Sequence, residues 1–190
     1  MAQMFSTIEI DIEKVCNLAR IPVSIKDNPI RNTAKILADN SFSEDSENVA
    51  FEYLLKYYEG LSFSSLCNFY DLEISSLEKF NYTNYFLPWY HTSPVTSFSD
   101  NAFITNISKE DIKRKVTKIK EILQSITKNG YDPERFVDRK GGYITGYRLV
   151  SKLKDDRFYV VSGNHRVACL SALGFKTVPV IFEKSRYFKP

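Results

Sequence analysis

The most regular hydrophobic pattern in the chain lies between residues 108 and 130. Its apolar positions recur at intervals of four and three residues, at Ile112, Val116, Ile119, Leu123 and Ile126. That interval places them on one face of an α-helix, opposite a polar face. Ser108-Lys-Glu-Asp111 has the form of a capping box at the start, and Asn129-Gly130 is a typical C-terminal cap. The pattern predicts a long amphipathic helix, which Pro133 keeps from continuing.

The residues after this helix alternate between strand-like and helix-like patterns. β-branched and aromatic runs predict strands at Phe136-Val137, Tyr143–Val150, Phe158–Val161 and Thr177–Phe182, with a turn at Lys140-Gly141-Gly142. A short helix is expected from Asn164, with Val167, Leu170, Ala172 and Leu173 on its buried side and Gly174 as its cap. This order of elements indicates an α+β (mixed α/β) fold.

The first hundred residues carry weaker patterns. Ile8, Ile10 and Ile12 suit a short strand, Asp11–Ala19 is compatible with a helix, and Pro22 and Pro29 break the stretch that follows. Residues 45–59 predict a helix capped by Asp45 or Ser46, with an apolar stripe of Val49, Ala50, Tyr53, Leu54 and Tyr57, that Gly60 ends. Residues 61–100 are rich in aromatic, Ser and Asn residues and predict short helices joined by ordered loops. We therefore expect a mainly helical, aromatic-rich region at residues 1–100 and a second domain at residues 101–190.

Composition narrows the classes of protein to which the chain can belong. Its 26 basic and 23 acidic residues give a formal net charge of +3, and no basic tract exceeds Lys113–Lys115, so no nucleic-acid partner is expected. Three distant cysteines without a CxxC pair favour a reducing compartment. The apolar runs are far shorter than the roughly 20 residues of a membrane helix, and the start lacks a secretory pattern. We expect a soluble, cytoplasmic protein without a membrane partner.

The residues with the clearest chemical pattern form a turn between a strand and a helix. The strand ends at Ser162-Gly163 and the helix opens at Asn164-His165-Arg166. The first N–H groups of a helix have no acceptor within it and attract anions, and glycine lets an anion approach the backbone closely. His165 and Arg166 add donors where the helix dipole disfavours cations, an arrangement that an anion between them would stabilise. A nucleotide phosphate is the anion we favour, although an ordinary solvated helix start stays an alternative.

A metal site is not expected there. The chain has two histidines, His91 and His165, and no second ligand lies at metal spacing.

Two stretches of the second half resemble the ParB/sulfiredoxin superfamily. GNHRVACLSALGFKTVPV resembles the signature turn of that family, in which Gly and His-Arg or Arg-Arg open a helix that is followed by Leu-Gly and a strand with Pro. ILQSITKNGYDP resembles the helix that precedes it, and together they cover about residues 108–183. The chain looks most similar to ParB-like proteins without a helix-turn-helix domain. The resemblance implies a nucleotide-binding domain at residues 101–190.

In this superfamily the turn binds nucleotide phosphates: CTP in partition proteins, ATP in sulfiredoxin, and ATP or ADP in free-serine kinases. By position, the resemblance implies a phosphate cradle of Gly163, Asn164, His165 and Arg166. Gly130 and Pro133 would shape the opposite wall, with Ser125 nearby. The implied cofactor is ATP or another nucleotide, accompanied by Mg²⁺.

Departures from the family pattern exclude two of its activities as expectations. Asn164 stands where sulfiredoxin has its reactive Cys, and we expect Cys169 to be a buried structural thiol. Asp132 stands where partition proteins have Gln, and no helix-turn-helix sequence follows before Pro190. Partition function and sulfinic acid reduction are therefore both disfavoured.

Two functions stay open. One is a small phosphotransferase that uses ATP or ADP on a small hydroxyl acceptor, with His165 and Arg166 as catalytic candidates and Glu121, Asp132 or Glu59 as a candidate base. The other is a non-catalytic nucleotide-binding regulatory or adaptor module, whose N-terminal region contacts a protein partner. A DNA-binding ParB-like function is disfavoured because the apolar face of the basic helix at Lys109–Lys120 must face the core.

Overall fold

The structure, a computed structural model, describes residues 7–17, 22–59, 98–99, 102–103, 108–133, 142–148 and 156–182. The helices are α1 (Pro29–Asp39), α2 (Glu44–Glu59), α5 (Lys109–Asn129) and α6 (Asn164–Ala172), with a short 3-10 helix η1 at Ile12–Lys14. One sheet contains β1 (Ile8–Asp11), β2 (Val15–Cys16), β5 (Ile144–Tyr147), β6 (Phe158–Ser162) and β7 (Thr177–Phe182). A separate two-stranded sheet pairs β3 (Phe98–Ser99) with β4 (Ala102–Phe103). The predicted α+β class is confirmed.

The five-stranded sheet is mixed, in the order β1-β7-β5-β6-β2. β1 runs antiparallel to β7 and β5 antiparallel to β6, whereas β5 is parallel to β7 and β2 is parallel to β6. Both edge strands therefore come from the start of the chain, and the three inner strands come from its second half. The division at residue 100 stays a prediction, and the described elements on either side of it share one sheet.

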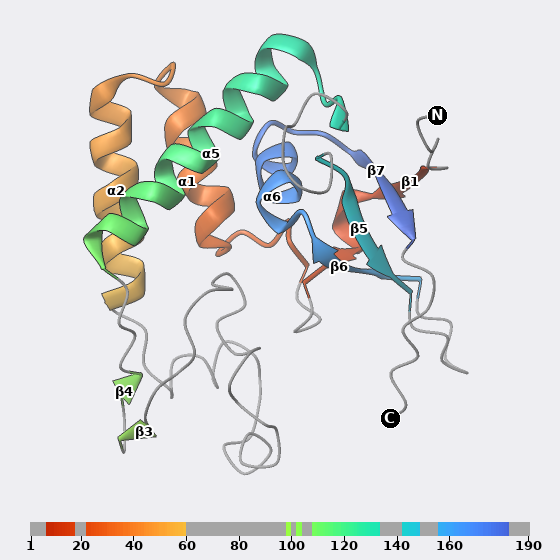
Figure 1. Ribbon diagram of the computed structural model, residues 1–190, viewed down its shortest axis with the longest axis horizontal. Coiled ribbons are helices and arrows are strands. Elements are labelled where there is room, and N and C mark those ends of the chain that lie inside the picture. The colour runs from red at the N-terminus through yellow and green to blue at the C-terminus, as the bar shows by residue number, and fades with distance from the viewer. Residues whose placement is uncertain are drawn as a thin grey trace.

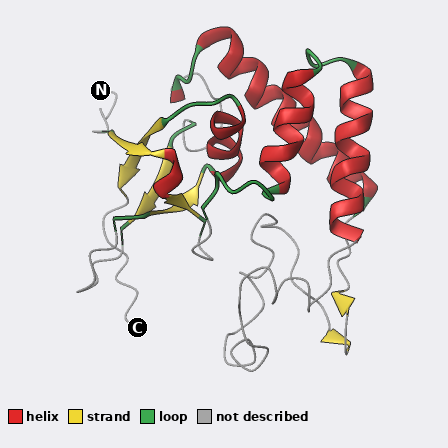
Figure 2. Ribbon diagram, turned by 180° about the vertical axis from the view of Figure 1, so that it is seen from behind, coloured by secondary structure: helices red, strands yellow, loops and turns green. Residues whose placement is uncertain are grey.

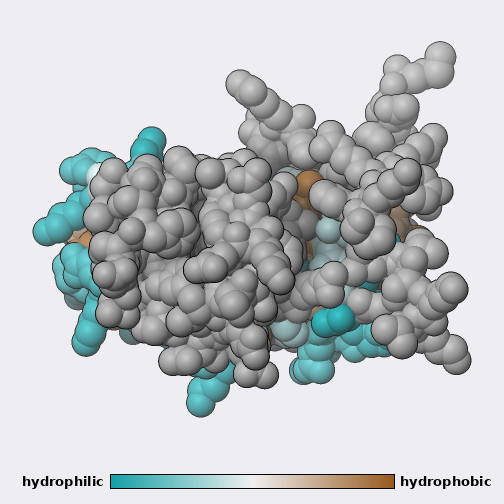
Figure 3. Space-filling view, turned by 90° about the horizontal axis from the view of Figure 1, so that it is seen from below, coloured by the Kyte–Doolittle hydropathy of each residue, from teal (hydrophilic) through white to brown (hydrophobic). Residues whose placement is uncertain are grey.

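The helices gather beside the sheet, with α6 between the sheet and the other three (Figures 1 and 2). α1 packs on α2, α5 and α6, and α5 packs on both α2 and α6. The core between these layers includes Val160 and Val178 from the sheet, Leu170 from α6, Leu123 from α5 and Leu37 from α1. At the end of the molecule where α2 lies, the described surface seen in Figure 3 is mostly hydrophilic. None of the helices in the described ranges has the length and apolar character needed to cross a membrane.

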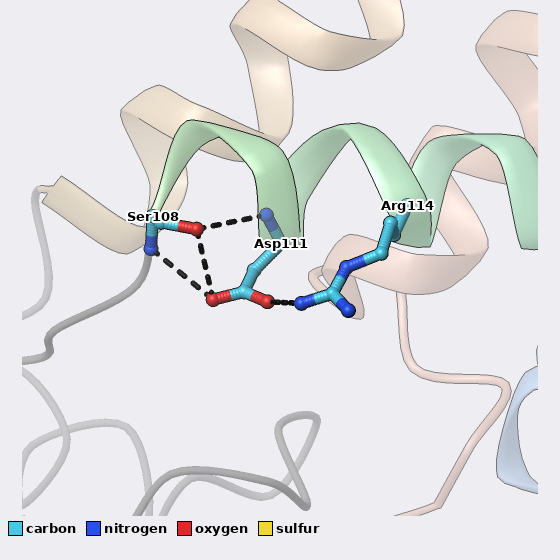
Figure 4. Close-up of polar contacts among 3 residues, drawn as sticks. All are labelled: Ser108, Asp111 and Arg114. Carbon is cyan, nitrogen blue, oxygen red and sulfur yellow. Dashed lines mark hydrogen bonds and ion pairs between the residues drawn. The ribbon is translucent and has the colours of Figure 1, made fainter.

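Helix α5 forms as predicted because its N-terminal cap, its apolar face and its C-terminal glycine all indicate the same helix. The Ser108 hydroxyl accepts a hydrogen bond from the Asp111 N–H at 3.1 Å, and the Asp111 carboxylate accepts one from the Ser108 N–H at 3.4 Å (Figure 4). Arg114 pairs with the same carboxylate. This hydrogen bond, followed by that from Ser108, holds the pKa of Asp111 below its ordinary value. All five apolar positions of the predicted stripe are buried, and Gly130 ends the helix at a φ of 71°.

Helix α1 lies where the sequence pattern predicts a break at Pro29. Pro29 instead opens the helix, where its missing N–H removes no helical hydrogen bond. Asn28 caps it: its side-chain oxygen accepts from the N–H groups of Ile30 and Arg31 at 2.9 and 3.2 Å. The side-chain amide of Asn28 also donates to the Val23 carbonyl at 2.7 Å, so the fully buried Asn28 is hydrogen-bonded on both sides.

The helix predicted at Asp11–Ala19 is wrong over its described part, residues 11–17. η1 occupies three residues there, and Val15 and Cys16 then pair with Phe158 and Tyr159 of β6. A strand of two residues has no periodicity of its own, so it is fixed by its pairing partner.

Helix α2 differs from its prediction at its cap and on one side of its stripe. Ser43 caps it, rather than Asp45 or Ser46, because the Ser43 hydroxyl accepts from the Ser46 N–H at 3.2 Å. Ala50 and Leu54 are buried as expected, whereas Val49 is 56% exposed and Tyr58 is buried in its place. The predicted strand at Phe136-Val137 lies outside the described residues. Of residues 61–100, for which short helices joined by loops are predicted, the structure describes only 98–99, and these form strand β3.

Candidate anion-binding site

The strand, turn and helix predicted around Gly163 are present. β6 ends at Ser162, Gly163 has a φ of 104°, and α6 begins at Asn164. The N–H of Val167 donates to the Gly163 carbonyl at 3.0 Å, which is the first bond of the helical series. The N–H groups of Asn164, His165 and Arg166 therefore precede the first acceptor that the helix supplies. Their placement at a positive helix end suits an anion.

Gly163 is required by its backbone and by its neighbour in the sheet. Its positive φ is a conformation that side chains rarely adopt. A Cβ atom at this position would also lie 3.0 Å from Cγ1 and 3.1 Å from Cα of Ile144. The turn thus sits directly against the beginning of β5.

The side chains of the turn are more buried than a solvated helix start would have them. Asn164 is 8% exposed and Arg166 7%, while His165 is partly exposed. Oδ1 of Asn164, Nε2 of His165 and Nε of Arg166 are themselves buried atoms. The guanidinium of Arg166 donates from Nη1 to the Tyr143 carbonyl at 3.4 Å. A cation is therefore held beside the helix start by the protein backbone.

The predicted opposite wall is joined to the turn through the residues before β5. Gly130 ends α5, and the hydroxyl of the next residue, Tyr131, donates to the Gly142 carbonyl at 3.0 Å. The structure thus connects the Gly130–Pro133 segment to Gly142, and Tyr143 to Arg166. Sequence reasoning did not include Tyr131, because its contact is with a residue that only the tertiary fold brings near.

The remaining site candidates are spread over several elements. Ser125 and Glu121 lie on α5, with Ser125 partly exposed and Glu121 exposed. Asp132 is partly exposed and follows Tyr131 directly. Glu59 is exposed at the end of α2, whose main contacts are with α1 and α5. Asp132 follows Tyr131, whose hydroxyl is bonded to the Gly142 carbonyl two residues before β5.

Cys169 is fully buried on α6, as predicted. Its Sγ lies 4.0 Å from the Ile119 carbonyl of α5. Burial raises the pKa of this thiol far above its ordinary value, and the nearby charge of Arg166 acts weakly in the opposite direction. A thiol in this state is a poor nucleophile.

No group of three His, Cys, Asp or Glu side chains with the geometry of a metal site occurs in the described ranges. Mg²⁺ that accompanies a nucleotide is bound largely by phosphate and water oxygens, with one or two carboxylates. Asp132, next to Pro133 of the predicted wall, is a partly exposed carboxylate.

Comparison of the chain with protein-family models, with curated proteins and with solved structures gives no match. The resemblance to the ParB/sulfiredoxin superfamily rests on the two sequence stretches alone.

Proposed function

We propose that this protein binds the phosphates of a nucleotide at the start of α6, in the manner of the ParB/sulfiredoxin superfamily. We further propose that it is a small phosphotransferase that uses ATP or ADP, with Mg²⁺, on a small hydroxyl acceptor. The observation that carries the proposal is the backbone of Gly163, which has a φ of 104° between a buried strand and the first turn of α6. This is the backbone arrangement with which phosphate-binding loops present N–H groups to an anion.

The charge of Arg166 supports the same proposal. A cation at a helix N-terminus is disfavoured by about 0.3 to 1 kcal/mol, and burial adds a desolvation penalty. Arg166 is nevertheless almost fully buried in the first turn. An anion at the turn would interact favourably with this charge, and charge-assisted hydrogen bonds to an anion are each worth about 1.5 to 3 kcal/mol.

Thermal unfolding in the presence of a nucleotide panel, with and without Mg²⁺, tests the binding step. Ligand at one hundred times its dissociation constant should raise the free energy of unfolding by about 2.7 kcal/mol. Gly163→Ala should abolish the shift, and Gly174→Ala is the matched control, because Gly174 also has a positive φ but lies at the other end of α6. Absence of a shift in the wild type with any nucleotide, with pyrophosphate or with sulfate at millimolar concentration would rule out the proposed site.

Phosphoryl transfer is tested by incubation with ATP or ADP, Mg²⁺ and a set of small hydroxyl compounds. His165→Ala should lower the rate at saturating nucleotide, because a donor at the turn meets charge that develops during transfer. Since a hydroxyl acceptor must lose a proton, one of the three carboxylates should act as base. Asp132→Asn should have the largest effect, with Glu121→Gln and Glu59→Gln as controls.

A non-catalytic regulatory or adaptor module is the second candidate. The candidate bases lie on three different parts of the chain: on α2, on α5 and after α5. Among the described residues they do not form an acid/base pair at the turn, and this favours the module. Nucleotide binding without any turnover would support it. DNA binding through α5 stays disfavoured, since Ile112, Val116 and Ile119 are buried.

A further inference from the structure

Three consecutive residues at the beginning of β5 are contacted by three different parts of the candidate site. Gly142 accepts the hydrogen bond from Tyr131 at 3.0 Å, and Tyr143 accepts that from Arg166 at 3.4 Å. Ile144 is the residue against which Gly163 packs. We call Gly142–Ile144 the lead segment of β5. It lies between the end of α5 and the start of α6.

The two donors act on neighbouring peptide groups of the same segment. Arg166 belongs to the first turn of α6, where an anion would bind, and Tyr131 belongs to the residues after α5. Ile144 is fully buried and paired with Val180 of β7, so this end of the segment is fixed in the sheet. Tyr131 and Arg166 hold its other two residues, so the loss of either contact should loosen the position that both maintain.

We propose that Tyr131 and Arg166 are positioning residues for the anion site. They fix the lead segment through two adjacent carbonyl oxygens and thereby connect the end of α5 to the turn at Gly163. In this role Arg166 holds the lead segment through the Tyr143 carbonyl, in addition to the charge that it presents to the anion beside the N–H groups of the turn. The ligand in this inference is the anion of the proposed function, so that part rests on the proposed function. The two hydrogen bonds to the lead segment do not depend on it.

A double-mutant cycle on pyrophosphate binding tests the shared role. Tyr131→Phe should raise the dissociation constant for pyrophosphate about fivefold, the change that one hydrogen bond of ordinary strength corresponds to. Arg166→Gln should raise it by at least as much, because it also removes a positive charge near the anion. The double variant should be weakened by much less than the product of the two changes, because both residues maintain one position. Tyr53→Phe is the matched control: its hydroxyl accepts from the Asn32 side chain at 3.0 Å between α1 and α2, and its removal should leave pyrophosphate binding unchanged.

Amide hydrogen exchange across the lead segment and β5 separates this inference from the proposed function. Tyr131→Phe and Arg166→Gln should each speed exchange there, and Tyr53→Phe should not. Two results would overturn the positioning role. One is a double variant whose dissociation constant rises by the full product of the two single changes, and the other is an amide exchange rate that stays unchanged in both single variants. If the wild type binds no pyrophosphate, the proposed function and the ligand of this inference both fall, and the exchange data still decide whether the two residues hold the segment.

Discussion

Alanine in place of Gly163 is the substitution that most directly tests the geometry of the turn. Gly163 combines a φ of 104° with a close neighbour, since an added Cβ would lie 3.0 and 3.1 Å from the side chain and the Cα atom of Ile144. Gly174 has a φ of 83°, and no described atom lies within 4 Å of its added Cβ. The two substitutions therefore share the backbone strain and differ in the steric contact.

The expected magnitudes follow from these two contributions. A side chain in the left-handed region costs about 1 to 2 kcal/mol, and the smaller freedom of alanine in the unfolded chain offsets about 0.4 to 1 kcal/mol of this. Gly174→Ala should therefore destabilise the protein by about 1 kcal/mol. Overpacking adds about 1 to 3 kcal/mol at Gly163, so Gly163→Ala should cost about 2 to 4 kcal/mol. Rotation of the Ile144 side chain cannot relieve the contact completely, because one of the atoms belongs to the backbone.

Urea unfolding followed by circular dichroism measures both variants under the same conditions. The midpoint should fall more for Gly163→Ala than for Gly174→Ala, with an unchanged dependence on urea concentration in both. Equal losses would refute the reasoning, because they would mean that β5 does not press against the turn. A smaller loss at Gly163 would refute it more strongly.

Three further predictions concern titratable groups. Cys169→Ala should cost about 1 kcal/mol from lost packing, keep nucleotide binding, and remove a thiol that labels slowly in the native protein; rapid labelling with loss of activity in the variant would contradict this. Burial lowers the pKa of Lys115 to about 8. Below about pH 8 the side chain is charged in the folded state, and carrying this charge while partly buried destabilises the protein. Lys115→Met should therefore raise the urea midpoint at pH 7, by an amount that shrinks as the pH rises above 8, and a constant difference would argue against it. The pKa of Asp111 is lowered by its hydrogen bond with Arg114. Its stabilising effect is present above the ordinary aspartate pKa of about 3.9 and lost as the pH falls through the lowered value, so Asp111→Asn should destabilise at pH 7 and become neutral in acid.

The described helices and strands after residue 108 were predictable because local rules there agree with the tertiary fold. Helix α5 has its capping box, apolar face and glycine cap in a single stretch of sequence, and each is present in the structure. The strand at Thr177–Phe182 has the predicted bounds. At the end of α6, the N–H groups of Gly174 and Phe175 donate to the carbonyls of Ser171 and Leu170 at 3.2 and 3.1 Å, a Schellman motif built on the glycine that sequence reasoning chose.

The first forty residues were predicted only in part. The short strand expected from Ile8, Ile10 and Ile12 is present as β1, whereas β2 and α1 were not predicted, for two different physical reasons. β2 has only two residues, and its strand conformation comes from pairing with β6, far away in the chain. Helix α1 carried a local cue that was missed: Asn followed by Pro is a cap followed by a residue suited to the first helical turn. Proline breaks a helix in its middle but is well suited to its first turn, and Pro29 stands in the first turn.

In the candidate site, too, some features are fixed by sequence neighbours and others by contacts between distant parts of the chain. The turn at Gly163 follows from neighbours in sequence, since a buried strand, a glycine and an apolar helix face leave few other conformations. The direction of Arg166 follows from the sheet order, which places β5 beside β6 and so brings the Tyr143 carbonyl to the first turn of α6. The contact of Tyr131 depends in addition on where α5 ends. Substitution at Gly163 therefore probes whether the local geometry makes an anion site, and substitution at Tyr131 probes whether the fold must hold it in place.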